Sequence, residues 1–153
     1  MEIIKNFNPI LWIFASYLLG AMATSFIKSL KILSSFENHH YIEDKLTKKL
    51  GVLKLGWLIR HSFMGKINPN IKFKGKLNKE RLEQLKHEMT LAETGHLIAF
   101  LFLQILIVTF LVLGVPFWQI IVYTILNIVF NLYLVFLQQF NKRRIDRLLK
   151  LKY

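Results

Sequence analysis

The chain has 153 residues, the length of about one domain, and contains no cysteine. Lysine and arginine number 21 against 9 aspartates and glutamates, a formal charge of +12, while 54% of the residues are hydrophobic. A water-soluble domain of this size cannot bury so much apolar side chain and a disordered chain would not contain it, so both classes are excluded. The lack of cysteine excludes disulfides, thiolate metal sites and cysteine nucleophiles. An apolar and strongly basic chain is typical of a membrane protein whose charges lie outside the bilayer.

Three apolar stretches are long enough to cross a bilayer, which takes about 20 residues of helix. We therefore predict an all-α integral membrane protein, one domain over residues 1–153, with spans at about residues 10–27, 91–114 and 116–139. Interfacial amphipathic helices are expected between the first two spans.

Two short sequences set the ends of these spans. Gly114 to Phe117 joins the last two into a tight hairpin, with Pro116 at the helix start, where its missing N–H costs little. Ala21 to Ala23 reads A-M-A, which resembles a signal-peptidase site and gives the first stretch a second interpretation. The apolar stretch continues past that site to Ile27, which favours a retained helix.

The distribution of basic residues predicts the orientation. Residues 28–90 hold 14 lysines and arginines, the tail 141–153 holds 6, and the first nine residues hold only Lys5. The positive-inside rule then makes the long segment and the tail cytoplasmic and puts the N-terminus outside. The basic excess favours anionic lipid headgroups or anionic cytosolic substrates as partners. No basic and aromatic groove pattern indicates nucleic acid, so no such partner is expected.

Segment 28–90 is expected to form amphipathic helices on the membrane surface. Apolar residues recur there at helical spacing with lysines between them, at Ile42, Leu46, Leu50 and Leu53. Asn68 to Asn70 predicts a turn, flanked by Gly65 and Gly75.

A further helix is expected to begin after Asn78, which can act as its N-cap, with Leu77 and Leu82 as a hydrophobic staple. Leu82, Leu85 and Met89 give it one apolar face, and it should continue into the second span.

Glu93 and His96 lie three residues apart, on one helix face, where this helix enters the bilayer. A carboxylate beside an imidazole raises its basicity and fixes its tautomer, and the pair can take a proton from an alcohol that attacks an acyl carbonyl. The alternative is that both residues mark the bilayer edge. One such pair supplies only two ligands, so no metal site is predicted. His39 and His40 are expected to be solvated in a loop.

Amide side chains follow the third span within a stripe roughly 80° wide on a regular α-helix; they are Asn127, Asn131, Gln138 and Asn141. Buried amides either hold helices together or line a polar groove. Because the second span begins at the membrane face where the third ends, Glu93 and His96 are expected to meet Gln138, Asn141 and Arg144. Arg144 or its basic neighbours can bind a phosphate or an oxyanion, although the basic tail also serves as an orientation signal.

Two motifs carry a family resemblance. Ala92 to Leu97 reads A-E-T-G-H-L, beside a family signature A-E-x-x-H-W. Asn131 to Tyr133 reads N-L-Y and Gln138 to Ile145 reads Q-Q-F-N-K-R-R-I, beside N-x-P and Q-R-Y-N-R-P-R-L with the same spacing. Both signatures resemble those of the glycosyl-4,4′-diaponeurosporenoate acyltransferases, small bacterial membrane enzymes of carotenoid biosynthesis. The chain departs from them at Leu97, Tyr133, Gln139 and Arg143.

The resemblance implies transfer of a fatty acyl group from an acyl thioester, acyl-coenzyme A or acyl carrier protein, to a hydroxyl of a glycosylated lipid such as a glycosyl carotenoid. It implies a multi-pass protein of the bacterial cytoplasmic membrane, and no cofactor beyond the acyl donor. In the expected mechanism His96, oriented by Glu93, is the general base and Arg144 holds charge on the donor or oxyanion. The substrate is held by Asn127, Asn131, Gln138 and Asn141.

Other interpretations remain open. Tyr17 to Gly20 and Arg144 to Lys150 resemble the ends of bacterial membrane glycerol-3-phosphate acyltransferases. The chain can also be a non-catalytic subunit or scaffold of a larger complex, with a membrane protein partner or a second copy of itself. A transporter is disfavoured, because three spans without inverted repeats enclose no pathway.

Overall fold

The computed structural model of the chain describes residues 8–29, 33–61 and 78–152, and the regular elements in these ranges are all helices. The long ones are α1 (Pro9–Ser29), α6 (Lys79–Val112) and a rod made of α7 (Phe117–Asn127), η3 (Ile128–Leu132) and α8 (Tyr133–Lys152). The short ones are α2 (Leu33–Glu37), α3 (Asp44–Lys49) and α4 (Val52–His61). The predicted all-α class is confirmed.

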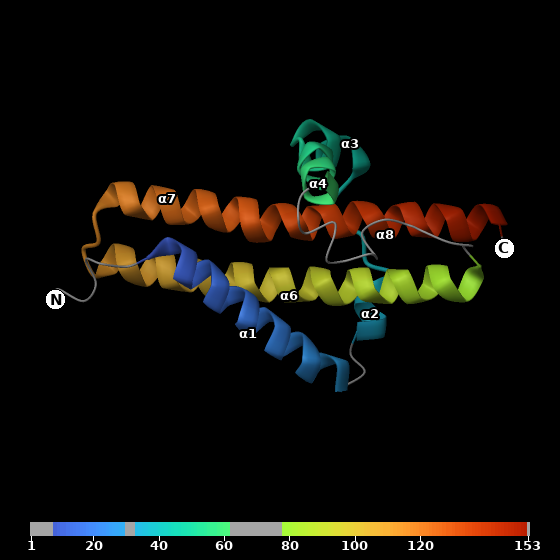
Figure 1. The fold of residues 1–153 in the computed structure, drawn as a ribbon, viewed down its shortest axis with the longest axis horizontal. Coiled ribbons are helices and arrows are strands. Elements are labelled where there is room, and N and C mark those ends of the chain that lie inside the picture. The colour runs from blue at the N-terminus through green and yellow to red at the C-terminus, as the bar shows by residue number, and fades with distance from the viewer. Residues whose placement is uncertain (1–7, 30–32, 62–77, 153) are drawn as a thin grey trace.

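Three helices in the described ranges are long and apolar enough to cross a membrane: α1, α6 and the α7–η3–α8 rod. Figure 1 shows α6 and the rod lying antiparallel side by side, α1 crossing α6 obliquely, and α3 and α4 resting on α8. The start of α1 lies near the α6–α7 hairpin, and α8 ends at the opposite end of the rod (Figure 1). The protein is therefore a membrane protein with three spanning helices, as predicted.

The hairpin between α6 and α7 is closed by a glycine in the left-handed region. Gly114 has φ +75°, and the amide of Val115 donates to the carbonyl of Phe110 at 3.0 Å. Such a glycine ends a helix without the steric cost that a side chain would add. Pro116 caps α7 immediately before its first residue. The hairpin thus forms where the sequence predicted it.

Two glycines let α1 and α6 approach closely. A Cβ atom on Gly20 would lie 2.5 Å from the backbone oxygen of Gly95, and one on Gly95 would lie 3.2 Å from the Thr24 methyl group. Small residues at such crossings allow backbone-to-backbone contact, which drives helix association where lipid replaces water.

The part of α6 beyond the membrane packs on the end of α8. The Asn78 side chain accepts a hydrogen bond from the Arg81 amide at 2.9 Å, which confirms the predicted N-cap. Leu82, Leu85 and Met89 are buried against Ile145, which confirms the apolar face. Leu77 and the turn expected between Gly65 and Gly75 lie outside the described residues.

The described part of the amphipathic segment contains the short helices α2, α3 and α4, and Gly51, at φ +72°, separates the last two. Of the predicted apolar set, Ile42 is buried and Leu53 is partly buried, whereas Leu46 and Leu50 are exposed, so only part of that set packs inward. Val52, beside Leu53, is buried as well. Helix α4 rests on α8 at a glycine: a Cβ on Gly56 would meet Leu137 at 2.8 Å.

Candidate functional site

A buried ion pair lies where the charge-free parts of the two long helices end. Helix α6 has no charged residue from Thr94 to Val112, about 28 Å at 1.5 Å per residue, and the rod has none before Lys142. Lys142 Nζ donates to Glu93 Oε2 at 2.9 Å, with exposed fractions of 0% for Lys142 and 5% for Glu93. Glu93 and Lys142 are the charged residues nearest the apolar part of their helices, and they neutralise each other, as buried charges require.

Two more side chains hold the Glu93 carboxylate. Tyr41 Oη and Gln139 Nε2 both donate to Glu93 Oε1, at 2.5 and 2.6 Å. Burial, and then the hydrogen bond and charge of Glu93, raises the pKa of Tyr41, so the phenol stays protonated and remains a donor. We call Tyr41, Glu93, Gln139 and Lys142 the Glu93 cluster.

The Glu93 cluster also holds the backbone that leads from α2 to α3. Lys142 Nζ donates to the carbonyl of Phe36 at 2.8 Å, and Gln139 Nε2 donates to the carbonyl of His39 at 3.1 Å. The segment between Phe36 and Tyr41, which we call the strap, is therefore tied to α6 and α8 through one carboxylate.

The partners of Glu93 differ from those expected. Glu93 was predicted to orient His96, but its carboxylate bonds to the strap and to α8. The His96 imidazole instead lies beside the Asn131 amide and edge-on to the Tyr17 ring, with centroids 5.5 Å apart and planes at 78°. Residues three apart on a helix are displaced by about 4.5 Å along it and by about 60° around it, which lets each side chain meet a different neighbour.

A second polar cluster lies deeper between the apolar helices. The Tyr17 hydroxyl donates to the Phe130 carbonyl at 2.8 Å, which ties α1 to η3. Asn131 Nδ2 donates to Asn127 Oδ1 at 3.0 Å, and Asn127 Nδ2 donates to the Phe100 carbonyl at 3.1 Å. Both asparagines are fully buried, and Asn131 Oδ1 has no hydrogen-bond partner in the described part of the chain. We call Tyr17, His96, Asn127 and Asn131 the His96 cluster.

The predicted amide stripe is displaced in its second half by the π-helical turn of η3. A π turn closes its hydrogen bonds one residue later than an α turn, so it holds one extra residue. Each later residue therefore takes the position around the rod that the residue before it would have on a regular α-helix. From Asn127 onward the buried positions of the rod are accordingly Asn127, Asn131, Val135, Gln139, Lys142 and Ile145. Gln139 and Lys142 therefore meet Glu93, in place of Gln138 and Asn141.

The displaced residues have other surroundings. Gln138 Oε1 is buried without a described partner, and Asn141 Nδ2 contacts Met89 Sδ at 3.9 Å. Arg144 is exposed. The sequence marked Gln139 only as a departure from a family motif and named Lys142 only as a basic neighbour of Arg144; Tyr41 carried no signal.

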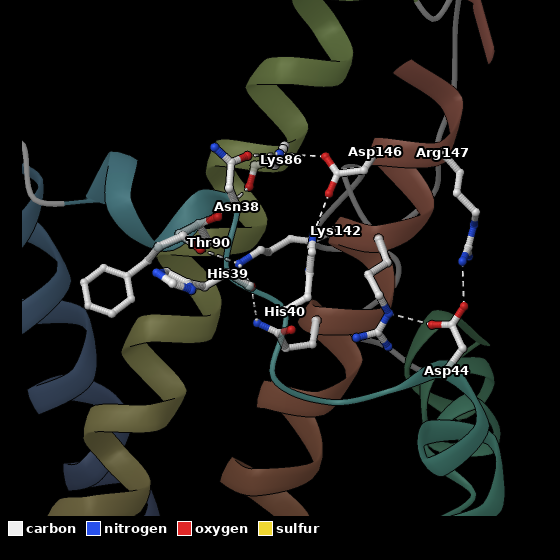
Figure 2. Close-up of polar contacts among 12 residues, drawn as sticks. Asn38, His39, His40, Asp44, Lys86, Thr90, Lys142, Asp146 and Arg147 are labelled. Atoms are coloured by element: carbon white, nitrogen blue, oxygen red, sulfur yellow. Dashed lines mark hydrogen bonds and ion pairs between the residues drawn. The ribbon is translucent and has the colours of Figure 1, made fainter. Parts of the chain in front are cut away.

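A third group of charges lies beyond the Glu93 cluster, along α8. Asp146 pairs with Lys86 at 2.6 Å and with His40 Nε2 at 2.7 Å, so His40 is paired instead of simply solvated. Asp44 pairs with Arg143 at 2.6 Å and with Arg147 at 2.5 Å (Figure 2). Burial raises the pKa of Asp44, but the hydrogen bonds from Arg147 and Arg143 outweigh it and lower that pKa below its usual value.

The chemistry that these clusters offer is acid–base and hydrogen-bonding chemistry. In the described residues no three histidine, aspartate or glutamate side chains gather as a metal site. A half-buried imidazole beside an unsatisfied amide oxygen can instead bind and deprotonate a hydroxyl group.

Comparison with protein families matches residues 24–151, most of the chain, to the family described as glycosyl-4,4′-diaponeurosporenoate acyltransferase. Comparison with curated proteins and with solved structures finds no match.

Proposed function

Because the chain belongs to the glycosyl-4,4′-diaponeurosporenoate acyltransferase family, whose name indicates an acyltransferase of carotenoid biosynthesis, we propose that it transfers a fatty acyl group from an acyl thioester to a hydroxyl of a glycosylated lipid. In this proposal the thioester supplies the activated acyl group, and no further cofactor takes part. The charged end of the long helices faces the cytoplasm and the N-terminus lies outside, in line with the charge asymmetry.

The observation that carries the proposal is the pairing of a base with an unsatisfied acceptor in the His96 cluster. Asn131 Oδ1 is buried without a described partner beside the His96 imidazole. A buried acceptor without a donor costs free energy, which an incoming hydroxyl group would recover. The sugar hydroxyl would donate to one of these two groups while the other aligns it.

The proposed reaction is direct transfer. His96 takes the proton of the sugar hydroxyl as the oxygen attacks the thioester carbonyl. The C–O bond forms, the C–S bond breaks, and the thiolate leaves with the proton returned by the imidazole, so the products are an ester and a free thiol. General base catalysis of this kind contributes roughly 10²- to 10⁴-fold to the rate.

The level of His96 in the helix pair suits a substrate with a polar head and an apolar tail. His96 lies only about 4.5 Å along α6 from Glu93, the first charged residue, which places it near the headgroup boundary. Beyond it, α6 exposes a run of large apolar side chains, namely Leu101, Ile105, Val108 and Leu111. A sugar at the boundary and an acyl or carotenoid chain along this face would match the amphipathic substrate.

We assign Glu93 the role of a positioning residue. Its contacts support a function in holding the strap across α6 and α8, one helical turn from His96. Gln139, Lys142 and Tyr41 share that function, whereas Gln138, Asn141 and Arg144 remain proposed substrate contacts at the same end.

The test is lipid analysis of cells that lack the gene and are complemented with variants. We expect the wild type to restore an acylated glycolipid and His96→Gln to lower its formation by about 10²-fold or more. His61→Gln is the matched control, because His61 stacks on Trp57 in α4, apart from both clusters. If His96→Gln restores the lipid fully, His96 is not the base. If even the wild type changes no acylated lipid and copurifies with a stoichiometric membrane protein, the scaffold interpretation replaces the enzyme.

A further inference from the structure

An open cavity of about 530 Å³ lies beyond the Glu93 cluster, at the end of α8. Asn38 and His40 from the strap line one side of it, and Arg143, Asp146, Arg147 and Lys150 from α8 line the other. Figure 2 shows how the strap faces Asp146 across this region while Arg147 reaches Asp44. The acid–base step at His96 gives these residues no role.

The charges around the cavity do not balance. The carboxylate that lines it, Asp146, is already held by Lys86 and His40. Three cations line the cavity with it, namely Arg143, Arg147 and Lys150, and the charges of Lys86 and Asp44, which lie just outside the lining, cancel each other. The lining lysine, arginine and aspartate side chains therefore carry a surplus of two positive charges, which matches a phosphate.

Two of the cations have capacity for a ligand. Arg147 is half-exposed and gives Asp44 one of its five N–H donors, through Nη1. Lys150 is exposed and has no ion-pair partner in the ranges that the structure describes. Guanidinium and ammonium groups bind phosphate oxygens through charge-assisted hydrogen bonds, the strongest class in proteins.

The distance from the cavity to the His96 cluster restricts the ligand. Arg147 follows Asn131 by 16 residues, about 24 Å along the rod. A ligand that contacts both must hold its phosphate at the end of a long arm. The phosphate and ester carbonyls of a membrane phospholipid are too close together to span this length. A fully extended phosphopantetheine arm falls short of it by about one helical turn, and the Arg147 side chain makes up the difference, because it leans toward the N-terminal end of the rod to reach Asp44, which Arg143 also contacts one turn earlier.

We propose that this cavity binds the phosphate of the phosphopantetheine arm that carries the acyl group, an arm shared by acyl-coenzyme A and acyl carrier protein. The inference rests on the proposed acyl transfer and names the donor side of it. The strap then separates the donor's phosphate from its thioester, with the arm running along α8 past the Glu93 cluster.

The test measures binding of coenzyme A itself, without acyl group or acceptor, to the full chain in phosphatidylcholine nanodiscs. We expect Lys150→Gln and Arg147→Gln each to weaken binding by about tenfold, the loss typical of one charge-assisted hydrogen bond. Lys45→Gln is the matched control, because it removes an exposed lysine of α3 that does not line the cavity. Pantetheine should bind much more weakly than 4′-phosphopantetheine, from which it differs only by the phosphate of the arm.

Three results would overturn the proposal. Equal affinities for 4′-phosphopantetheine and pantetheine would mean that no phosphate is recognised. Unchanged affinity in Lys150→Gln and Arg147→Gln would place the site elsewhere. Loss of binding in nanodiscs that contain phosphatidylglycerol would assign the cavity to a lipid headgroup. Because no transfer is needed for this readout, a protein that binds coenzyme A but acylates nothing refutes the proposed function and leaves the binding site standing.

Discussion

The buried pair of Glu93 and Lys142 makes a quantitative prediction about stability. Lys142 is fully buried and donates both to Glu93, at 2.9 Å, and to the Phe36 carbonyl, at 2.8 Å. Glu93→Gln removes the negative charge and leaves the ammonium group buried without a counterion. Breaking a buried ion pair in this way typically costs about 3–5 kcal/mol of unfolding free energy.

That cost converts into a measurable change in melting temperature. For a chain of this length, 1 kcal/mol corresponds to roughly 2–4 °C, so Glu93→Gln should lower Tm by about 6–20 °C. The double variant Glu93→Gln with Lys142→Met removes both charges and should recover much of the loss, because apolar replacement of a buried pair is often nearly neutral. Thermal unfolding of the purified protein in one fixed detergent, followed by circular dichroism, gives all values.

A control variant and a contradicting result belong to this comparison of single and double variants. Glu88→Gln, one and a half turns away on α6 and half-buried, changes the same chemical group without touching Lys142 and should change Tm little. If Glu93→Gln melts like the wild type, or if the double variant is as unstable as the sum of the two single variants, the two charges do not stabilise each other and the reasoning fails.

Three further predictions follow from single contacts. Gly20→Leu should destabilise the protein by at least about 1–3 kcal/mol, since its Cβ would lie 2.5 Å from the Gly95 oxygen, whereas Ala21→Leu on the exposed face should not; thermal unfolding compares them. Tyr17→Phe should lower unfolding free energy by about 0.6–1.7 kcal/mol through loss of the hydrogen bond to Phe130, and a wild-type Tm would contradict this. Because the pKa of Asp44 is lowered, its arginine pairs stabilise the fold fully above its ordinary pKa of 3.8 and lose that effect as pH falls through the lowered value. The Tm difference between wild type and Asp44→Asn should therefore shrink in acid. A pH-independent difference would refute the pairing.

The sequence predicted the features that depend on local pattern. The length of the apolar stretches predicted the three spanning helices. Asn78 predicted the start of α6, and Gly114 with Pro116 predicted the hairpin. The apolar face of Leu82, Leu85 and Met89 followed from helical periodicity. Each of these needs only neighbours within a few turns of the chain.

The polar contacts were predicted less completely, because they depend on how each helix is rotated about its own axis relative to its neighbour. The amide stripe was placed on a regular α-helix, which is correct up to Asn131 and fails after the π turn. No residue type within Ile128–Leu132 announces such a turn. Tyr41 was also missed, since its role follows from where the strap crosses α6 and α8, a tertiary fact.

The π turn has a consequence for how this third rod can change. Deleting one residue between Ile128 and Leu132 would restore α geometry and leave Gln139 and Lys142 facing Glu93, because the π turn accommodates one extra residue without changing which face of the rod meets α6 beyond it. A change in length of one residue is therefore tolerated inside the turn, whereas the same deletion in α8 between the turn and Gln139 would rotate Gln139 and Lys142 away from Glu93 by about 100°. Diversification of the polar end is therefore expected to proceed by exchange of side chains at constant spacing along α8, with changes in length confined to the turn.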